Sequence, residues 1–356
     1  MRILHVITSL YTGGAEHLMV DLLPQLNKGG DVVELLLFDG TETPFYKELA
    51  SRKIKIHSLG EGGNVYNPRN IFKFVSFIGQ YDLIHTHNTA CQLFAPMARM
   101  LSGKKPLLVT TEHNATNRRR GKRWLKPLDR WMYRQYNAII CIADQTRANL
   151  EAYLGPQKKI RTIYNGVDTS RFVMPVKDIT GQHQFTITMV AGFRPQKDQD
   201  TLIRAMSHLS ESYTLQLVGD GERRPILEQL IADLNLQGRV KMLGIRTDIP
   251  QILENSDIVA LSSHWEGLSL SSIEGMASGR PFIASDVDGL REIVDSSGLL
   301  FPEGDERQAA ALIHGLCANP SEYRTVAQRC QAKAKEYDIS KMAKAYHLLY
   351  EQLLHN

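Results

Sequence analysis

The sequence predicts two α/β domains in tandem, each built on a doubly wound parallel sheet. Its 356 residues suit two domains of about 100–200 residues each. Short apolar runs alternate with longer segments of helical spacing through both halves of the chain. The chain is 43% hydrophobic and 22% charged, which excludes a disordered, collagen-like or disulfide-stapled protein.

The first domain, residues 1–170, contains mostly continuous apolar runs of the kind found in strands that are buried on both faces. Helices are expected between them, for example over residues 16–26 and 89–101. This βαβ alternation predicts a Rossmann-like domain. The expected strands span residues 2–7, 31–38, 54–58, 83–86, 107–111, 138–142 and 161–164.

A second Rossmann-like domain, residues 171–338, follows a polar linker over residues 168–184, where Pro175 and Gly181 interrupt the pattern. Its expected strands span residues 185–191, 214–218, 240–243, 258–262, 281–284 and 299–301. Residues 339–356 contain a final helix. Its stretch over residues 339–354 is amphipathic, with apolar positions Met342, Ala345, Leu348, Leu349 and Leu353. This helix either packs on the second domain or crosses back to the first.

The cysteines and the apolar runs bear on the cellular compartment. Cys91, Cys141, Cys317 and Cys330 lack CxxC or CxxH spacing, which fits reduced thiols and disfavours a structural zinc site. No 18 consecutive apolar residues occur, and the first apolar run is too short for a signal peptide. We expect a cytoplasmic protein that, where it works at a membrane, lies on the inner face.

Positive charge is concentrated in one stretch of the first domain. Residues 1–170 carry 23 basic and 14 acidic side chains, whereas the rest has a net charge of −5. From Arg118 to Arg134 there are eight cations and one acid, interleaved with Trp124, Trp131 and Tyr133. Such a stretch suits an anionic membrane surface. The alternatives are a pyrophosphate-linked lipid ligand and a solvated loop with both Trp in the core. No nucleic-acid-reading module accompanies it.

Ligands of parallel α/β sheets bind at the carboxyl ends of the strands, so two such domains would face each other across a central cleft. Gly13 and Gly14 follow the first strand and open a helix, where the backbone can approach an anion closely. A tight turn is the alternative. The dinucleotide fingerprint GxGxxG is absent, which disfavours an NAD-linked oxidoreductase.

Arg194 and Lys197 follow the first strand of the second domain, with Asp198 or Asp200 placed to cap the next helix. Two cations at a strand end beside a helix N-terminus suit a diphosphate; a solvated surface pair is the alternative. Asp198 with Asp200, and Asp286 with Asp288, both spell DxD, the pattern that holds a metal ion on a diphosphate. Because the two cations can balance the phosphates, we expect no metal.

The segment of residues 262–277 carries the strongest signal. A strand ends at Ser262, Glu266 lies in the following loop, and a helix begins near Ser269, with Glu274 one turn further in. Backbone N–H groups near Ser269 and Leu270 would point at a phosphate. A carboxylate at position 274 could accept hydrogen bonds from the vicinal hydroxyls of a ribose.

These residues resemble the retaining family 4 glycosyltransferases (glycosyltransferase group 1), which have the GT-B fold. The resemblance runs from residue 2 to about residue 300 and is most specific in the second half. It implies transfer of a sugar from a nucleotide diphosphate donor, a UDP-sugar, to a hydroxyl of a glycan or lipid-linked saccharide, without a cofactor or metal. The matching motifs are Gly13-Gly14-Ala15-Glu16, Asn165-Gly166-Val167-Asp168, Arg194 with Lys197, Glu266-x7-Glu274 and Gly289-Leu290-Arg291-Glu292-Ile293-Val294.

The resemblance also implies roles for these residues. Arg194 and Lys197 would stabilise the leaving diphosphate, Glu274 would hold the ribose and Glu266 would lie near the donor sugar. The loop of Gly13 and Gly14 would close over the phosphates or the acceptor, and the loop at Ile245 would flank the base. The remaining donor contacts would come from Leu268, Ser269 and Leu270.

His113 ends a strand of the first domain, and in the family a histidine at such a position lies beside the donor sugar. A histidine satisfied by backbone partners is the alternative. His85 and His87 also end a strand, but they lack an obvious carboxylate partner for a metal, so we expect polar lining of the acceptor side. Other functions for this architecture are a nucleotide-sugar epimerase and a non-catalytic sugar-nucleotide-binding protein.

Overall fold

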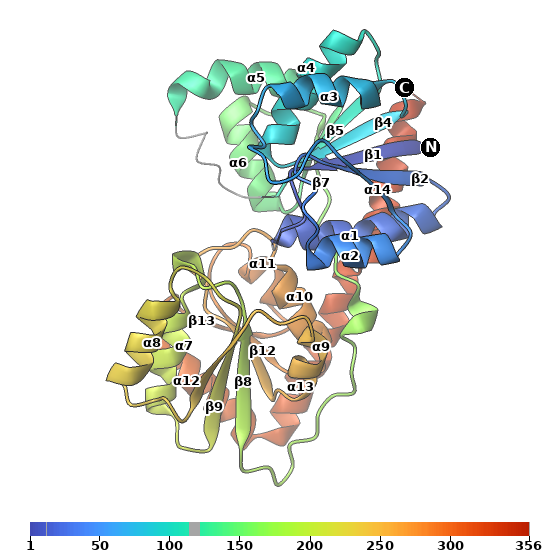
Figure 1. The fold of residues 1–356 in the computed structure, drawn as a ribbon. Coiled ribbons are helices and arrows are strands. Elements are labelled where there is room, and N and C mark those ends of the chain that lie inside the picture. The colour runs from blue at the N-terminus through green and yellow to red at the C-terminus, as the bar shows by residue number, and fades with distance from the viewer. Residues whose placement is uncertain (12, 114–121, 356) are drawn as a thin grey trace. The chain divides into compact units, whose positions relative to one another are not determined.

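The computed structural model describes residues 1–11, 13–113 and 122–355. The chain divides into two compact units: unit 1 comprises Met1–Gly166 with Ile339–Asn356, and unit 2 comprises Val167–Asp338 (Figure 1). The first connection between the units therefore falls at Gly166, four residues before the predicted boundary. The last helix of the chain belongs to the first unit.

Unit 1 contains a parallel sheet of seven strands in the order β3-β2-β1-β4-β5-β6-β7, as far as the described residues show. Its strands are β1 (Arg2–Ile7), β2 (Val32–Leu37), β3 (Lys55–Ser58), β4 (Leu83–His87), β5 (Leu107–Glu112), β6 (Ala138–Cys141) and β7 (Ile160–Thr162). Its helices are α1 (Gly14–Lys28), α2 (Pro44–Ser51), α3 (Arg69–Ile78), α4 (Thr89–Ser102), α5 (Lys126–Arg134), α6 (Asp144–Leu154) and α14 (Ile339–Leu354).

Unit 2 repeats the architecture with six described strands in the order β10-β9-β8-β11-β12-β13, all parallel. The predicted fold class, two Rossmann-like parallel-sheet domains, is confirmed. The strands are β8 (Phe185–Val190), β9 (Tyr213–Val218), β10 (Val240–Gly244), β11 (Ile258–Leu261), β12 (Phe282–Ser285) and β13 (Leu299–Phe301). The helices are α7 (Gln199–Ala205), α8 (Arg224–Asp233), α9 (Ile249–Glu254), α10 (Leu270–Ala277), α11 (Arg291–Val294), α12 (Glu306–Ala318) and α13 (Pro320–Ala334).

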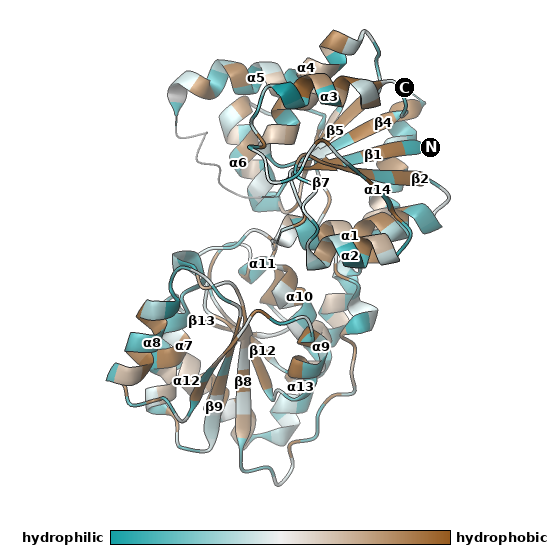
Figure 2. Cartoon of the chain, in the orientation of Figure 1, coloured by the Kyte–Doolittle hydropathy of each residue, from teal (hydrophilic) through white to brown (hydrophobic). Residues whose placement is uncertain are grey.

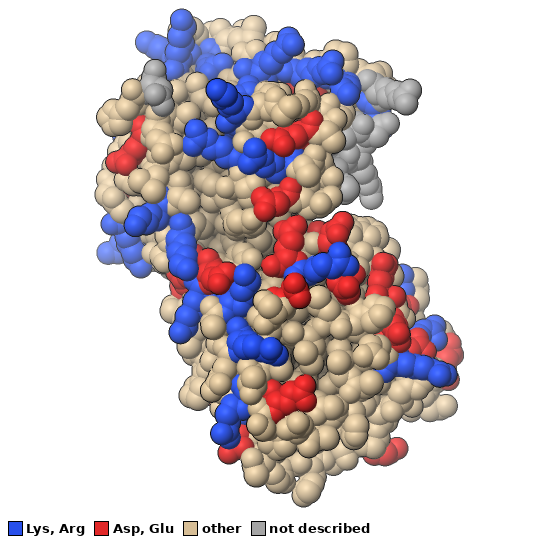
Figure 3. Space-filling view, turned by 180° about the vertical axis from the view of Figure 1, so that it is seen from behind, with Lys and Arg blue, Asp and Glu red and all other residues tan. Residues whose placement is uncertain are grey.

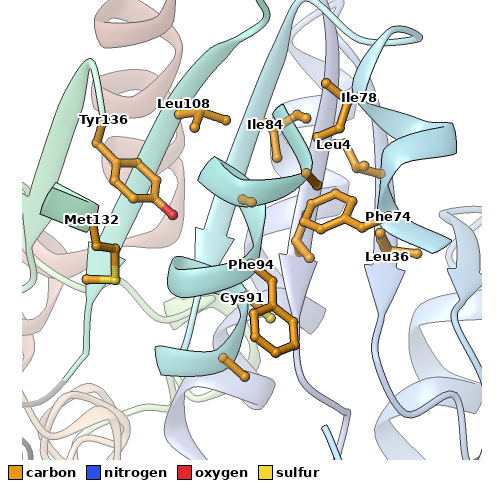
Figure 4. Close-up of a cluster of buried hydrophobic side chains, with 14 of the residues drawn as sticks. Leu4, Leu36, Phe74, Ile78, Ile84, Cys91, Phe94, Leu108, Met132 and Tyr136 are labelled. Atoms are coloured by element: carbon orange, nitrogen blue, oxygen red, sulfur yellow. The ribbon is translucent and has the colours of Figure 1, made fainter. Parts of the chain in front are cut away.

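The two faces of the unit 1 sheet have different chemistry. One face forms an apolar cluster in which Leu4 and Ile84 of the strands meet Phe74, Phe94 and Met132 from α3, α4 and α5 (Figure 4). The strands are largely hydrophobic along their length, as the brown ribbon of Figure 2 shows. Successive side chains alternate between faces. The neighbours of Leu4 and Ile84 in sequence, which include two histidines, therefore point to the opposite face.

Helix α14 covers that opposite face, packed beside α1. The predicted apolar face of this helix was wrong in part: Met342 and Leu349 are buried, but Leu348 is 46% exposed. Tyr346 and Tyr350 are fully buried in its place. The tyrosines are tolerated inside because their hydroxyls find hydrogen-bond partners on the strands below.

Candidate functional site

Lys197 and Glu266 meet at the carboxyl edge of the unit 2 sheet. They come from the loops after β8 and β11, which pair as neighbouring parallel strands. Lys197 Nζ forms an ion pair with Glu266 Oε1, and Ser263 Oγ donates a hydrogen bond of 2.7 Å to the same oxygen. Glu266 is only 6% exposed. The structure thus brings together two of the predicted site residues and adds Ser263, which sequence reasoning missed.

Arg194 stands at the start of the same loop, exposed to solvent. In the described part of the chain its guanidinium has no ion-pair partner, unlike Lys197. Asp198 caps α7 by accepting hydrogen bonds from the N–H and the hydroxyl of Thr201, as expected. Asp200 instead binds Arg223, whose Nη2 lies 2.8 Å from both of its carboxylate oxygens. Both carboxylates of this DxD pair therefore have structural partners. The Arg194 guanidinium on the same loop has no ion-pair partner among the described residues.

The backbone around Glu266 is held by a close approach that only glycine permits. Gly289 has φ +82°, and a Cβ there would lie 2.1 Å from the carbonyl oxygen of Gly267. The Glu266 N–H donates to the carbonyl of Asp288 at 3.3 Å. The backbone at Gly289 therefore positions the Glu266 loop.

Helix α10 begins at Leu270, and its N-terminus is open. Ser269 occupies the N-cap position, but its side chain makes no capping hydrogen bond. The first-turn N–H groups of α10 can accordingly bind an anion. Leu268 is buried below this turn, and Glu274 lies further along α10, 6% exposed. Ile245, 67% exposed, sits on the loop that follows β10.

Unit 1 has a cavity of about 290 Å³ at the carboxyl ends of its strands. Its polar lining includes Thr8, Tyr66, Asn88, Gln92, Glu112 and His113. Glu112 is 4% exposed and accepts hydrogen bonds of 2.7 Å from the Gln92 amide and the Tyr133 hydroxyl. A buried carboxylate with neighbouring amide and imidazole groups suits recognition of a ligand rich in hydroxyls.

Gly13 and Gly14 lie on the loop after β1, at the N-terminus of α1. Among the described residues no atom lies within 4 Å of a Cβ added to Gly14, so the backbone there is open to a ligand. Asn88, with φ 66°, donates through Nδ2 to Thr8 Oγ1 at 3.0 Å and to Glu16 Oε1 at 3.4 Å. These contacts connect the ends of β1 and β4 to the first turn of α1.

A row of histidines crosses three neighbouring strands under α14. His5 of β1 lies opposite His85 of β4, and His87 is two residues further along β4. His87 Nε2 is 3.0 Å from His5 Nδ1, and His87 Nδ1 is 2.8 Å from His113 Nε2. Burial lowers the pKa of His5 to about 3 and that of His113 to about 4. It also lowers the pKa of His87, with the neighbouring histidines adding to the effect.

His85 belongs to a separate hydrogen-bond set that holds α14. Its Nδ1 is 2.5 Å from the Tyr350 hydroxyl and its Nε2 is 2.7 Å from Thr111 Oγ1. Thr111 Oγ1 in turn lies 3.1 Å from the Tyr346 hydroxyl. Both ring nitrogens of His85 are thereby occupied.

His5, His85 and His87 offer nitrogens within 4.8 Å of one another, a spacing that could accommodate a metal ion. Hydrogen bonds already engage five of their six ring nitrogens. The absence of a metal stays a prediction. Sequence reasoning overlooked His5 because a single histidine inside an apolar run is typical of a core strand; its register opposite His85 carries the signal.

The stretch from Arg118 to Arg134 is described only from Lys122 onward; Arg118, Arg119 and Arg120 lie outside the described residues. Trp124 is 74% exposed, whereas Trp131 packs partly against the apolar cluster. The alternative with both Trp in the core is therefore wrong for Trp124. Figure 3 shows Lys and Arg side chains gathered on unit 1. No helix in the described ranges is both long and apolar enough to cross a membrane.

Comparison with solved structures defines the class of fold as GT-B. HepE from Anabaena, solved with UDP, superimposes with a TM-score of 0.85 at 23% identity, covering 99% of this chain and all of that one. A sucrose-phosphate synthase from Thermosynechococcus elongatus gives a TM-score of 0.79 at 21% identity, with full coverage of both chains.

The sequence places the protein in a family within that class. Residues 12–171 match Glycosyltransferase Family 4 and residues 184–319 match Glycosyl transferases group 1. The chain therefore belongs to the glycosyltransferases that these two matches describe, family 4 in its first half and group 1 in its second, as its motifs predicted.

Two curated relatives illustrate the range of the family. An Escherichia coli UDP-Gal:alpha-D-GlcNAc-diphosphoundecaprenol alpha-1,3-galactosyltransferase is 32% identical over 230 residues, which span 59% of each protein. The putative glycosyltransferase EpsF of Bacillus subtilis is 26% identical over 316 residues, 83% of this chain and 81% of that protein.

Proposed function

We propose that the protein is a retaining, metal-independent hexosyltransferase. It moves a sugar from a UDP-sugar to a hydroxyl of a glycan or lipid-linked saccharide, in the synthesis of a cell-surface polysaccharide or glycolipid. The observation that carries this proposal is the arrangement of Arg194, Lys197 and the open N-terminus of α10 at one edge of the unit 2 sheet.

These groups suit a diphosphate for electrostatic reasons. Arg194 is an exposed cation without an ion-pair partner in the described chain, and Lys197 is held at the strand end by Glu266. In the transfer, the bond between the sugar C1 and the diphosphate oxygen breaks while the acceptor oxygen bonds to C1 on the same face. The departing phosphate takes the acceptor proton. Cations fixed beside the phosphates lower the energy of the charge that develops on them.

The relatives support the substrate classes. The Escherichia coli relative is named for a UDP-galactose donor and a diphosphoundecaprenol-linked acceptor, and HepE was solved with UDP. In unit 1, the cavity beside His113 has the carboxylate and amide groups that bind sugar hydroxyls. We propose that Gly13 and Gly14 contact the donor phosphates or the acceptor. Ile245 flanks the base and Glu274 holds the ribose.

A thermal-shift screen against UDP, GDP, ADP and single nucleotide sugars tests the donor class, because a ligand of the folded state raises the melting temperature. We expect UDP and one UDP-sugar to stabilise the protein. A shift by GDP or ADP alone would refute the UDP assignment. Incubation of UDP-sugars without acceptor separates transfer from epimerisation, since an epimerase would form a new UDP-sugar isomer.

Two measurements test retention of configuration and metal independence. The anomeric configuration of the product, read by NMR, should match that of the donor; inversion would refute retention. Activity should survive EDTA, because Arg194 and Lys197 occupy the role of a metal ion at the diphosphate. Loss of activity on chelation, restored by Mg²⁺ or Mn²⁺, would refute metal independence.

We also propose that the stretch from Arg118 to Arg134 holds unit 1 against an anionic membrane surface. Exposed Trp124 and Leu128 lie among cations there, the combination that favours the headgroup region. Flotation with anionic liposomes should fall when Arg118, Arg119 and Arg120 are changed to Ala.

The matched control for that experiment changes three other exposed cations of unit 1, Lys28, Lys47 and Lys53, to Ala. Both variants lose the same charge, so a specific surface predicts loss of flotation only in the first. Equal flotation of the two variants would refute a membrane role for this stretch.

A further inference from the structure

The three imidazoles of His5, His87 and His113 form one continuous chain of hydrogen bonds. His87 sits in the middle, with one nitrogen 3.0 Å from His5 and the other 2.8 Å from His113. His5 and His87 are fully buried. His113 ends the chain at the cavity, which it lines. Its Nε2 contacts His87, and within the described parts of the chain Nδ1 is the ring nitrogen left for a ligand.

We propose that His87 and His5 are positioning residues that fix the proton of His113 on Nδ1, so that His113 meets its ligand as a hydrogen-bond donor. This assignment concerns the free protein and does not depend on the reaction. Its functional consequence, donation to an oxygen of the transferred sugar, rests on the proposed glycosyltransferase function.

The number of ring protons on the three histidines limits which tautomers they can adopt. Burial in apolar surroundings disfavours the charged form of each ring, so the three imidazoles are neutral at physiological pH and carry one N–H each. Each N···N contact needs one donor and one acceptor. Only two arrangements satisfy both contacts, and in each all three protons point the same way.

In the first arrangement every proton is on Nε2. His113 donates to His87, His87 donates to His5, and His5 is left with an N–H at Nε2. In the second arrangement every proton is on Nδ1. His5 donates to His87, His87 donates to His113, and the lone pair of His5 Nε2 is left over.

The surroundings of His5 Nε2 decide between the two. This atom is buried and has no hydrogen-bond partner among the described residues. His85 of β4, whose ring centroid lies 4.8 Å from that of His5, cannot serve, because Tyr350 and Thr111 occupy its two nitrogens. In protein backbones a buried N–H without a partner is rarer than an under-satisfied carbonyl acceptor, and we extend that preference to the imidazole of His5. The second arrangement, with the proton of His113 on Nδ1, is therefore favoured.

The tautomer of His113 determines which hydrogen bond it can make with a ligand in the cavity. A neutral His113 with its proton on Nδ1 can donate to a hydroxyl oxygen or a ring oxygen, but it offers no lone pair to abstract a proton there. His113 thus favours a ligand oxygen at this position, and it does not act as a general base toward the cavity.

The direct test is a long-range ¹H–¹⁵N NMR spectrum of the full-length protein labelled with ¹⁵N-histidine. The bare ring nitrogen resonates well downfield of the protonated one. A His113→Asn variant identifies the signals of His113. We expect a protonated Nδ1 and a bare Nε2 in the free protein at pH 7. A protonated Nε2, or an imidazolium, would overturn the proposal.

Two variants of His87 test the positioning role. In His87→Asn, the side-chain amide can place an N–H where the imidazole Nδ1 donates, whereas His87→Leu has no donor. For correctly folded variants we expect kcat/KM for the nucleotide sugar to stay within about threefold in His87→Asn. In His87→Leu it should fall about tenfold, the size expected for one hydrogen bond. Equal losses in the two variants would overturn the role.

UDP affinity separates this proposal from the proposed function, because His87 lies in unit 1 and the cations proposed for the diphosphate, Arg194 and Lys197, lie in unit 2. We expect both His87 variants to bind UDP as the wild type does. Stoichiometric zinc in the purified protein, found by elemental analysis, would also overturn the proposal. A nitrogen that ligates a metal cannot serve as a donor or acceptor in the chain.

Discussion

Replacing Lys197 with Met removes the ammonium while keeping a side chain of similar length. Two effects are expected. The free protein loses the ion pair with Glu266. That carboxylate is 6% exposed and, among the side chains of the described residues, keeps only the hydrogen bond from Ser263. The complex with UDP loses a cation beside the diphosphate. The two effects are measured separately, by unfolding and by calorimetric titration.

The expected magnitudes follow from exposure. Breaking a fully buried ion pair costs about 3–5 kcal/mol. The Lys197 side chain is 19% exposed, so solvent screens part of this and we expect about 1–3 kcal/mol. A hydrogen bond to a charged group is worth about 1.5–3 kcal/mol. Since Glu266 competes for Lys197 in the free protein, we expect the lower end, about a tenfold weaker affinity for UDP.

Unit 2 offers a matched control. Lys177 Nζ pairs with Asp257 at 2.7 Å, with exposures of 28% and 3%, close to those of the Lys197 pair. Asp257 directly precedes β11, at the opposite edge of the same sheet. Lys177→Met should cost similar stability and leave UDP affinity unchanged. Equal UDP affinity in Lys197→Met and the wild type, or equal loss in both variants, would refute the diphosphate role.

Three further predictions concern the scaffold. Gly289→Ala should destabilise unit 2 by about 2–4 kcal/mol in denaturant unfolding, because its Cβ would clash with backbone at a positive φ. Tyr350→Phe should cost about 1–2 kcal/mol and increase amide exchange in α14, since it leaves His85 Nδ1 without its partner. Lowering the pH should destabilise unit 1. His5 and His113 have folded pKa values of about 3 and about 4, below the ordinary 6.5, so the unfolded chain binds more protons. Each histidine should lower the free energy of unfolding by about 1.4 kcal/mol for every pH unit as the pH falls from 6.5 toward 4. Thermal melts at several pH values measure this loss.

Each of these has a control. Gly304 also has a positive φ, 73°, but no atom of the described chain lies within 4 Å of its added Cβ, so Gly304→Ala should cost about 1 kcal/mol. Similar costs at both glycines would remove the close-approach argument. Unchanged exchange in α14 after Tyr350→Phe would show that its apolar face alone holds the helix. A melting temperature of unit 1 that stays constant from pH 6.5 to 4.5 would contradict neutral buried histidines.

Much of the fold was predictable because each strand is a self-contained apolar run. The strand at Arg2–Ile7 and the helix at Ile339–Leu354 have the predicted bounds. The buried face of that helix was not predictable from apolarity alone. Tyr346 and Tyr350 replace Leu348 in the interior because histidine and threonine partners lie beneath them, on strands far away in sequence.

The candidate site, like the fold, was predictable from the sequence only in part. Lys197 and Glu266 could be singled out because both follow strands, and parallel strands place such loops on one edge. The pairing between them, and the part played by Ser263, depend on β8 and β11 being neighbours, which no local pattern encodes. His5 was missed for a related reason, since its meaning comes from its register opposite His85.

The placement of α14 has a consequence for synthesis on the ribosome. Strands β1, β4 and β5 emerge early, but the helix that covers their histidine face is translated only after all of unit 2. Unit 2 is contiguous in the chain and can complete its own core first. During that interval His5, His85 and Thr111 lack the cover of Tyr346 and Tyr350. The histidine face of the unit 1 sheet therefore stays without its helical cover until α14 has been synthesised, although unit 1 begins the chain.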